Sequence, residues 1–371
     1  MLRSLDIFSG IGGLTRALEG LATPVSYCEK DQAARSVMET LMRHGKLPRA
    51  PVADDVCTLK GASLKGKVDM IVAGIPCTGF SLAGSRAGFE NEQSGLYSHV
   101  VRLVREIRPS YIFLENVPGI LTIGIDKVCK NIGSLGYDLW WIVVPASAVG
   151  SPQHRKRWFC LAVNKTTSPK RPERLKVRGA WKWFSWAKET VPRMCLGSSK
   201  EARRRIPMLG NAVVPDCARL AFLLLWTGCR VDAHTLRKMT GFTLTRPAVS
   251  SDTDTQAGAC LGKGIVVIEG PKGMMGPPSL GLVLDPKAFG DGKGSAYTTS
   301  GLVKTPRALN AWGTPRHAIG YCATNSLTVR SAKDLGTQVR FERGTPDAVR
   351  PGFTNPQWVE WLMGFPKDWT K

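Results

Sequence analysis

Short apolar runs alternate with amphipathic stretches over the first 165 residues of the chain. The apolar runs are typical of strands and lie at 4–8, 24–30, 68–74, 110–117, 137–145 and 157–163. The amphipathic stretches have the helical period and lie at 12–21, 31–44 and 99–109. Strands that are apolar throughout and separated by helices are covered on both faces. The pattern therefore predicts an α/β fold with a doubly wound, mostly parallel sheet.

The pattern changes after residue 165. A basic segment, 165–205, holds thirteen Lys and Arg against three Glu, with three Trp and one Phe among them. A further apolar helix is expected at 216–226, which would complete a first domain of residues 1–228. Residues 229–350 are rich in Gly, Pro, Thr and Ser and predict a smaller β-rich domain. Its strand candidates are 264–270, 280–285, 326–331 and 337–343. The apolar and aromatic segment 351–371 is expected to dock back on the first domain.

The charge of the chain is unusual. Fifty-one Lys and Arg against twenty-nine Asp and Glu leave a formal net charge of +22. Such an excess favours a polyanionic partner, because basic side chains displace the counterions of phosphates. A membrane surface or an unspecialised basic surface would also account for it.

Other features of the sequence bear on where the protein resides. No run reaches the roughly 18 apolar residues of a membrane span, and the first residues lack the pattern of a signal peptide. The ten cysteines are irregularly spaced and include no CxxC pair. We therefore expect an intracellular, reducing compartment, free thiols and no membrane association.

Glycines follow the first predicted strand, in FSGIGG (8–13). Gly10, Gly12 and Gly13 allow a tight turn at a helix N-terminus, which suits a cofactor. Glu29 lies at the end of the second strand, where an acid commonly binds ribose hydroxyls, and Asp55 is placed to bind an adenine amino group. The spacing is not the dinucleotide G-x-G-x-x-G, and a purely structural turn stays open as an alternative.

Two reactive side chains follow neighbouring strands. Cys77 follows the run 68–74, and Glu115 lies near the end of 110–117. If those strands are adjacent, a thiol and a carboxyl group share one cleft, which permits covalent catalysis with proton donation. A lone cysteine is otherwise most often a small buried hydrophobe. Arg155 and Arg157 lie on one face of the last strand by period two, where forked hydrogen bonds could bind an oxygen acceptor, unless this is only a solvated strand edge.

Six motifs in order resemble those of the DNA cytosine-5 methyltransferases. They cover most of residues 5–226 and read DIFSGIGGLTRAL, YCEKD, GIPCTGFS, FLENVPGI, QHRKRWF and LGNAVVP. The resemblance implies a Rossmann-like methyltransferase fold, S-adenosyl-L-methionine as cofactor and no metal. It also implies double-stranded DNA as substrate and a target recognition domain at 229–350. We expect a monomer.

The resemblance also implies roles for individual residues. Cys77 would attack C6 of a flipped cytosine, and Glu115 would donate to N3. Arg157, helped by Arg155, would bind O2 of the base and orient the carboxyl group. The implied cofactor-binding residues are Phe8, Gly10, Gly12, Leu14, Glu29, Asp55, Pro76, Asn211, Ala212 and Val213, the last three on the methionine side.

Three departures from the family pattern stand out. Thr78 occupies a position where the family usually has glutamine, and Lys30 one where an aromatic residue often stacks on adenine. WLMGFP (361–366) resembles a family motif that commonly precedes LGNAVVP, whereas here it follows, as in viral and phage members. The alternatives are a tRNA cytosine-5 methyltransferase and a catalytically lapsed DNA-binding homologue. A nicotinamide oxidoreductase with a redox thiol is disfavoured because both G-x-G-x-x-G and CxxC are missing.

Overall fold

A computed structural model of the chain describes residues 1–80, 88–90, 95–153, 155–166, 181–186, 189, 191–195, 199–226, 243–245, 265–269, 279–284 and 353–371. The strands expected at 326–331 and 337–343 and much of the basic segment lie outside these residues.

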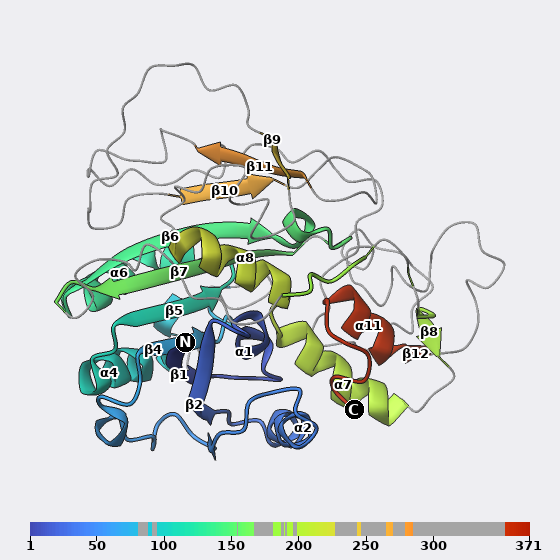
Figure 1. Cartoon of the computed structure of the whole chain (residues 1–371), viewed down its shortest axis with the longest axis horizontal. Coiled ribbons are helices and arrows are strands. Elements are labelled where there is room, and N and C mark those ends of the chain that lie inside the picture. Colours follow the sequence, from blue (N-terminus) through green and yellow to red (C-terminus); the bar gives the residue numbers. More distant parts are fainter. Residues whose placement is uncertain are drawn as a thin grey trace.

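A large twisted sheet runs through the molecule, in the strand order β3-β2-β1-β4-β5-β7-β6 and then β10-β11-β9 (Figure 1). The strands from the first half of the chain are β1 (Leu2–Ile7), β2 (Ala22–Cys28), β3 (Val52–Ala53), β4 (Met70–Gly74), β5 (Tyr111–Asn116), β6 (Tyr137–Pro145) and β7 (Lys156–Asn164). The others are β9 (Thr243–Thr245), β10 (Ile265–Glu269) and β11 (Ser279–Leu284). Each of the six apolar runs in the first 165 residues forms a strand, which confirms the predicted α/β class.

The sheet is not parallel throughout. β1 to β5 pair in parallel, but β7 lies between β5 and β6 and is antiparallel to both. Only the short 3₁₀ helix η3 (Ala146–Val149) and a loop join β6 to β7. A parallel pair needs a crossover of a dozen or more residues, so this connection forces the chain to turn straight back.

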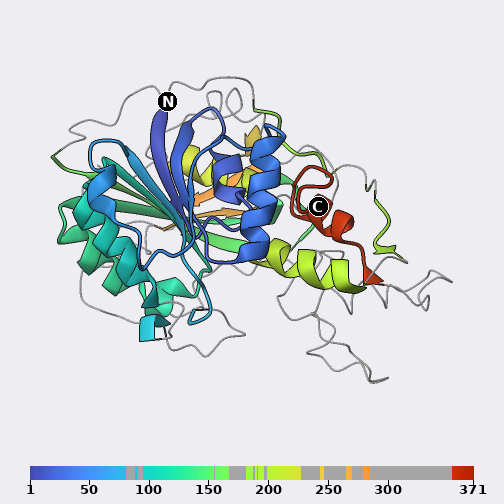
Figure 2. The same cartoon turned by 90° about the horizontal axis from the view of Figure 1, so that it is seen from below.

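Helices cover both faces of the sheet, as Figure 2 shows with α2 (blue) opposite the teal helices. One face carries α1 (Gly13–Ala17), α2 (Gln32–Arg43) and α8 (Pro215–Trp226). The other carries α4 (Tyr97–Ile107), α5 (Ile120–Ile123) and α6 (Ile125–Gly133). α1 is shorter than the helix expected at 12–21, because the chain turns after Ala17 to enter β2.

The chain returns to the first face at its C-terminal end. α7 (Ser199–Asn211) leads into α8, and α11 (Pro356–Leu362) packs on α7 beside the C-terminus (Figure 1). β12 (Phe353–Thr354) pairs with β8 (Met194–Cys195), where the segment before α7 passes by. Lys200–Trp226 could cross a membrane by length and composition alone, but 89% of its most apolar window is buried, as in a core helix.

Candidate active site

The turn after β1 has the backbone conformation that its glycines predict. Phe8, Gly10 and Gly12 have φ of 55°, 54° and 78°. A Cβ built at Gly10 meets no atom within 4 Å, so this position faces open space, whereas one at Gly12 would lie 2.6 Å from Leu47. Residues 8–14 therefore form a tight turn, here named the glycine turn, with one open side at the start of α1.

The Glu29 carboxylate lies against the glycine turn. Its two oxygens accept hydrogen bonds from the backbone N–H of Gly10, at 2.7 Å, and of Asp31, at 2.8 Å. Asp31 in turn caps α2 by accepting from the Ala34 N–H. Glu29, which follows β2, thus joins the glycine turn to the start of α2. It is the residue that the sequence predicts as the ribose-binding acid.

A second acid lies beneath the same turn and was not among the predicted site residues. Asp6 is 1% exposed on β1 and accepts a hydrogen bond from the Thr15 hydroxyl on α1. Burial raises the pKa of Asp6 to about 7, and the charge of Glu29 adds to the rise. The motif DIFSG contains this residue, but its burial could be known only from the packing of α1 on the sheet.

Asp55 lies in the loop after β3. Its carboxylate accepts the Cys57 N–H at 2.8 Å and lies 3.8 Å from the Lys30 ammonium. The Cys57 N–H holds the pKa of Asp55 below its usual range. Lys30 therefore contributes a charge at the position where an aromatic residue was expected.

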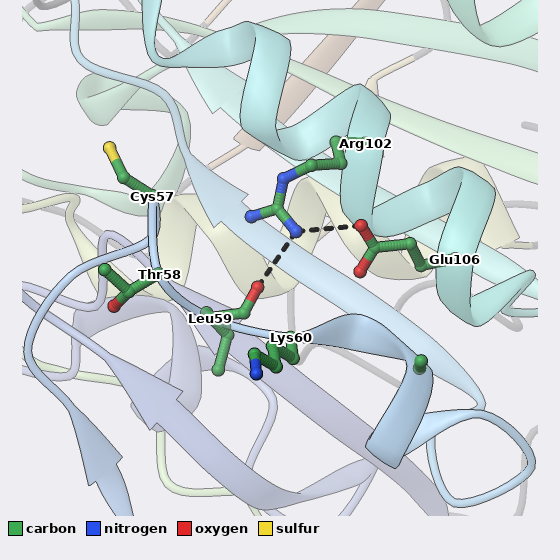
Figure 3. A pocket seen from close by; sticks show the side chains of 7 residues that line it. Cys57, Thr58, Leu59, Lys60, Arg102 and Glu106 are labelled. Carbon is green, nitrogen blue, oxygen red and sulfur yellow. Dashed lines mark hydrogen bonds and ion pairs between the residues drawn. The ribbon is translucent and has the colours of Figure 1, made fainter.

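An open depression of about 560 Å³ adjoins this loop (Figure 3). It is lined by Cys57, Thr58, Leu59, Lys60, Ala62, Arg102 and Glu106. The Arg102 guanidinium donates to the Leu59 carbonyl and to Glu106, both at 2.9 Å, as the dashed lines in Figure 3 show. These bonds fasten the loop to α4, so Arg102 and Glu106 already have partners within the fold.

Cys77 and Glu115 come from adjacent strands. β4 pairs with β5 in parallel, with Gly74 opposite Glu115, and the Ile75 N–H donates to the Glu115 carbonyl at 3.1 Å. A Cβ at Gly74 would lie 3.5 Å from Glu115 Oε2 and 3.7 Å from Leu14 Cδ1. The end of β4 therefore lies next to both the Glu115 carboxyl group and the glycine turn. Cys77, three residues beyond Gly74, is half-buried.

Arg157 on β7 pairs with Glu115. The Arg157 Nε lies 2.9 Å from Glu115 Oε1, and the two side chains are only 14% and 12% exposed. Burial raises the pKa of Glu115, although Arg157 and Arg155 act against the rise. Burial also raises the pKa of the Cys77 thiol, which Arg157 counteracts and Glu115 reinforces. Both acidic groups therefore hold their protons more tightly than in water.

Arg155 has different partners. Its Nη2 donates to the carbonyls of Gly210, at 3.1 Å, and Ala212, where α7 meets α8. Its Nε and Nη1 are buried without a hydrogen-bond partner among the described residues. Arg155 thus holds the 211–213 segment, which lies on the glycine turn: a Cβ at Gly13 would be 3.1 Å from Val213 Cγ1. Asn211 is exposed beside it, and Ala212 is half-buried.

Among the described residues, no three His, Cys, Asp or Glu side chains form a group that could bind a metal ion.

The aromatic residues at 181–186 belong to the basic segment, but their described contacts are with other parts of this chain. Trp181 lies between the guanidinium groups of Arg16 and Arg219, and Trp186 is buried against α11. Trp181 thus packs on the first domain and Trp186 on the C-terminal segment.

Comparison with known proteins identifies the family. The profile of the C-5 cytosine-specific DNA methylases matches residues 2–193. The type II methyltransferase M.CviJI of Paramecium bursaria Chlorella virus IL3A is 32% identical over 99% of this chain and 97% of its own length. M.HhaI of Haemophilus parahaemolyticus is 31% identical over 43% of this chain and 48% of its own. A crystal structure of a putative DNA modification methyltransferase encoded within an E. coli prophage is 31% identical over 45% of this chain and 47% of its own, with a TM-score of 0.37. The chain belongs to the C-5 cytosine-specific DNA methylase family and is an S-adenosyl-L-methionine-dependent DNA cytosine-5 methyltransferase.

Proposed function

We propose that Cys77, Glu115 and Arg157 form the cytosine side of the active site and that the glycine turn, Glu29 and Asp55 form its cofactor side. The observation that carries this proposal is the position of the Glu115 carboxyl group. It is paired with Arg157 and lies close to Gly74, at the end of the strand leading to Cys77, and Gly74 in turn lies close to Leu14 of the glycine turn.

The residues on the cofactor side fit S-adenosyl-L-methionine. Gly10 leaves room on the open side of the turn, and the Glu29 carboxylate beside it suits ribose hydroxyls. Asp55, partly exposed, suits an adenine amino group, and Pro76 with 211–213 would complete the methionine end. When bound, the cofactor supplies a methyl group activated by its sulfonium sulfur.

On the cytosine side, Cys77 acts as the nucleophile. C5 of cytosine is a weak nucleophile while the ring is aromatic. Addition of the Cys77 sulfur to C6 breaks that aromaticity and makes C5 react like an enamine. The raised pKa of the thiol means that it must lose its proton within the complex. After methylation, loss of the C5 proton expels the sulfur.

Glu115 supports that addition by donating a proton or hydrogen bond to N3, where negative charge develops. A raised pKa favours the protonated form that can donate. Arg157 holds the carboxyl group in place through its Nε and would bind O2 of the base with its other nitrogens. We assign Arg155 a positioning role, because its donor reaches the carbonyls next to Asn211.

The substrate we propose is double-stranded DNA, with the target base flipped out because C6 is inaccessible in a stacked duplex. The net charge of +22 supports a polyanionic partner. We further propose that residues 1–228 are the catalytic domain, 229–350 recognise the target sequence, and 351–371 dock on the catalytic domain. A monomer in an intracellular, reducing compartment completes the proposal.

Transfer of labelled methyl groups tests it. The purified protein is incubated with labelled S-adenosyl-L-methionine and either duplex DNA or tRNA, and 5-methylcytosine is mapped in the DNA by bisulfite sequencing. We expect label in duplex DNA at a defined set of cytosines. Label in tRNA alone, or no label in either despite cofactor binding, would overturn the proposal.

A further inference from the structure

We propose that Trp369 is a positioning residue for the cofactor, because it fixes the glycine turn from the C-terminal segment (residues 353–371). Its indole Nε1 donates to the Ile11 carbonyl at 2.9 Å, across 358 positions of the chain. Trp369 is 1% exposed, and so is Ile11. A hydrogen bond between two buried groups fixes the donor and acceptor more firmly than an exposed one.

Ile11 lies in the middle of the glycine turn, and its carbonyl accepts the bond from Trp369. It lies between Gly10 and Gly12, which both have positive φ and so gain their conformation from the lack of a side chain. Such a backbone is also the easiest to distort. The bond from Trp369 holds the peptide group between Ile11 and Gly12. The residue before Ile11 is Gly10, whose N–H donates to Glu29.

A second ring from the same segment contacts the turn. A Cβ at Gly13 would be 3.4 Å from Phe365 Cζ, so the ring of Phe365 packs closely on that backbone. The rings of Phe365 and Trp369 lie 5.4 Å apart. The glycine turn is therefore packed by two aromatic side chains that the sequence places far from it.

A buried polar cluster orients Trp369. The Glu360 carboxylate of α11 is fully buried and accepts from Arg205 on α7 at 2.8 Å, from the Asp368 N–H at 2.8 Å and from the Thr370 N–H at 2.7 Å. Arg205 Nε also donates to the Thr370 hydroxyl at 2.8 Å. Asp368 is held at φ 62°, a conformation that few residues with side chains adopt. The residues on both sides of Trp369 are thus fixed by one carboxylate.

The same segment also binds the turn that precedes Arg155. Gln153 Nε2 donates to the Leu362 carbonyl at 2.8 Å. The C-terminal segment therefore contacts both the glycine turn and the turn that leads into the strand of Arg157. Residues 229–350 separate the C-terminal segment from the first domain in sequence. Trp369 and Phe365 of that segment nevertheless contact the glycine turn on the cofactor side.

The test rests on the proposed cofactor site and compares two Trp→Phe variants of the full chain. Trp369→Phe removes the donor to Ile11. Trp226→Phe is the matched control, because Trp226 is similarly buried on α8 and its Nε1 has no hydrogen-bond partner among the described residues. Its ring packs on that of Tyr111, the first residue of β5, whereas Glu115 lies near the other end of the same strand. Calorimetry measures the affinity for S-adenosylhomocysteine, and steady-state kinetics measure KM for each substrate and kcat.

We expect Trp369→Phe to weaken S-adenosylhomocysteine binding and to raise KM for S-adenosyl-L-methionine by about threefold to tenfold, as expected for one buried hydrogen bond. The value of kcat at saturating cofactor and KM for DNA should stay within about twofold, since the bond lies outside the cytosine side. Trp226→Phe should change none of these. Equal affinities in both variants, or a fall in kcat without a change in cofactor KM, would overturn the proposal.

Two further measurements separate the possible failures. If Glu29→Ala leaves S-adenosylhomocysteine affinity unchanged, the proposed cofactor site itself is wrong; if only Trp369→Phe has no effect, the role of Trp369 is wrong. Hydrogen exchange on the unaltered protein needs no variant to fold. S-adenosylhomocysteine should slow amide exchange in 363–371 as well as in 8–14, and an unchanged C-terminal peptide would contradict the proposal.

Discussion

The two sides of the active site are built differently. On the cofactor side, the glycine turn is held by contacts to its backbone from three remote segments: Glu29 binds the Gly10 N–H, Val213 packs on Gly13, and Trp369 binds the Ile11 carbonyl. On the cytosine side, the described contacts are between charged side chains, with the buried pair of Glu115 and Arg157 at their centre. Contacts to the backbone thus set the shape of the glycine turn on the cofactor side. On the cytosine side, burial raises the pKa values of Cys77 and Glu115. Substitutions should therefore separate cofactor affinity from the chemical step.

The largest effect is expected from Cys77→Ser. The hydroxyl is far less acidic than the thiol and a poorer nucleophile at neutral pH, so methyl transfer should fall by about 10⁴-fold or more. Cofactor affinity should be unchanged, because the side chain lies outside the glycine turn. Methyl transfer and S-adenosylhomocysteine binding are measured in parallel. Cys129→Ser, another half-buried thiol, is the control, and near-normal activity of Cys77→Ser would refute the nucleophile assignment.

Glu115→Gln should act on the same side with the next largest effect. The amide keeps the shape but lacks the acidic proton and the charge that pairs with Arg157, so kcat should fall by about 10²- to 10⁴-fold. Single-turnover rates at saturating cofactor measure it. Glu106→Gln removes a comparable partner of an arginine, Arg102 on α4, and should be nearly silent. A similar loss in both variants would mean that a general change in charge causes it.

Glu29→Ala should affect only the cofactor side. Removing a carboxylate that would bind ribose hydroxyls, and that also accepts two backbone N–H groups, should raise KM for S-adenosyl-L-methionine by about 10- to 100-fold. The value of kcat at saturating cofactor should change little. Glu39→Ala, an exposed carboxylate on α2, serves as the control. A fall in kcat with unchanged KM would erase the distinction between the two sides.

The smallest effect concerns Asp6 and is seen in stability. Its pKa is about 7 in the folded chain, against an ordinary value of 3.8 for aspartate, so the folded state binds more protons between these pH values. Stability should therefore fall as pH rises from 4 to 7, by about 3 kcal/mol between pH 5 and pH 8. Asp6→Asn should reduce the fall by that amount in denaturant unfolding, and the rise of the pKa of Asp216 to about 6 leaves a smaller slope. Asp69→Asn should keep the full slope, because Arg3 lowers the pKa of Asp69 and this carboxylate stays charged over the range. An unchanged slope in Asp6→Asn would refute the assignment.

Local signals predicted the strands and the residues at their ends. The apolar runs are contiguous, and the carboxyl ends of parallel strands share one edge, so Cys77 and Glu115 could be placed together before any coordinates. The reversed direction of β7 was missed, because nothing in an apolar run records the direction of its neighbour. The period-two placement of Arg155 beside Arg157 assumed that both lie on one strand, but β7 begins at Lys156, and the Arg155 donor reaches the α7–α8 junction.

The sequence by itself determined the fold class and the order of the motifs, and through them the family. Both depend on residue types at short spacing, which the chain records directly. Only the tertiary structure decided that Asp6 is buried under the glycine turn, that Glu360 closes a polar cluster and that Trp369 binds Ile11. The residues that these contacts join are 9 positions apart for Asp6 and Thr15 and 358 for Trp369 and Ile11. In each case the strength of the contact depends on the exclusion of water, which exists only once the helices have packed on the sheet.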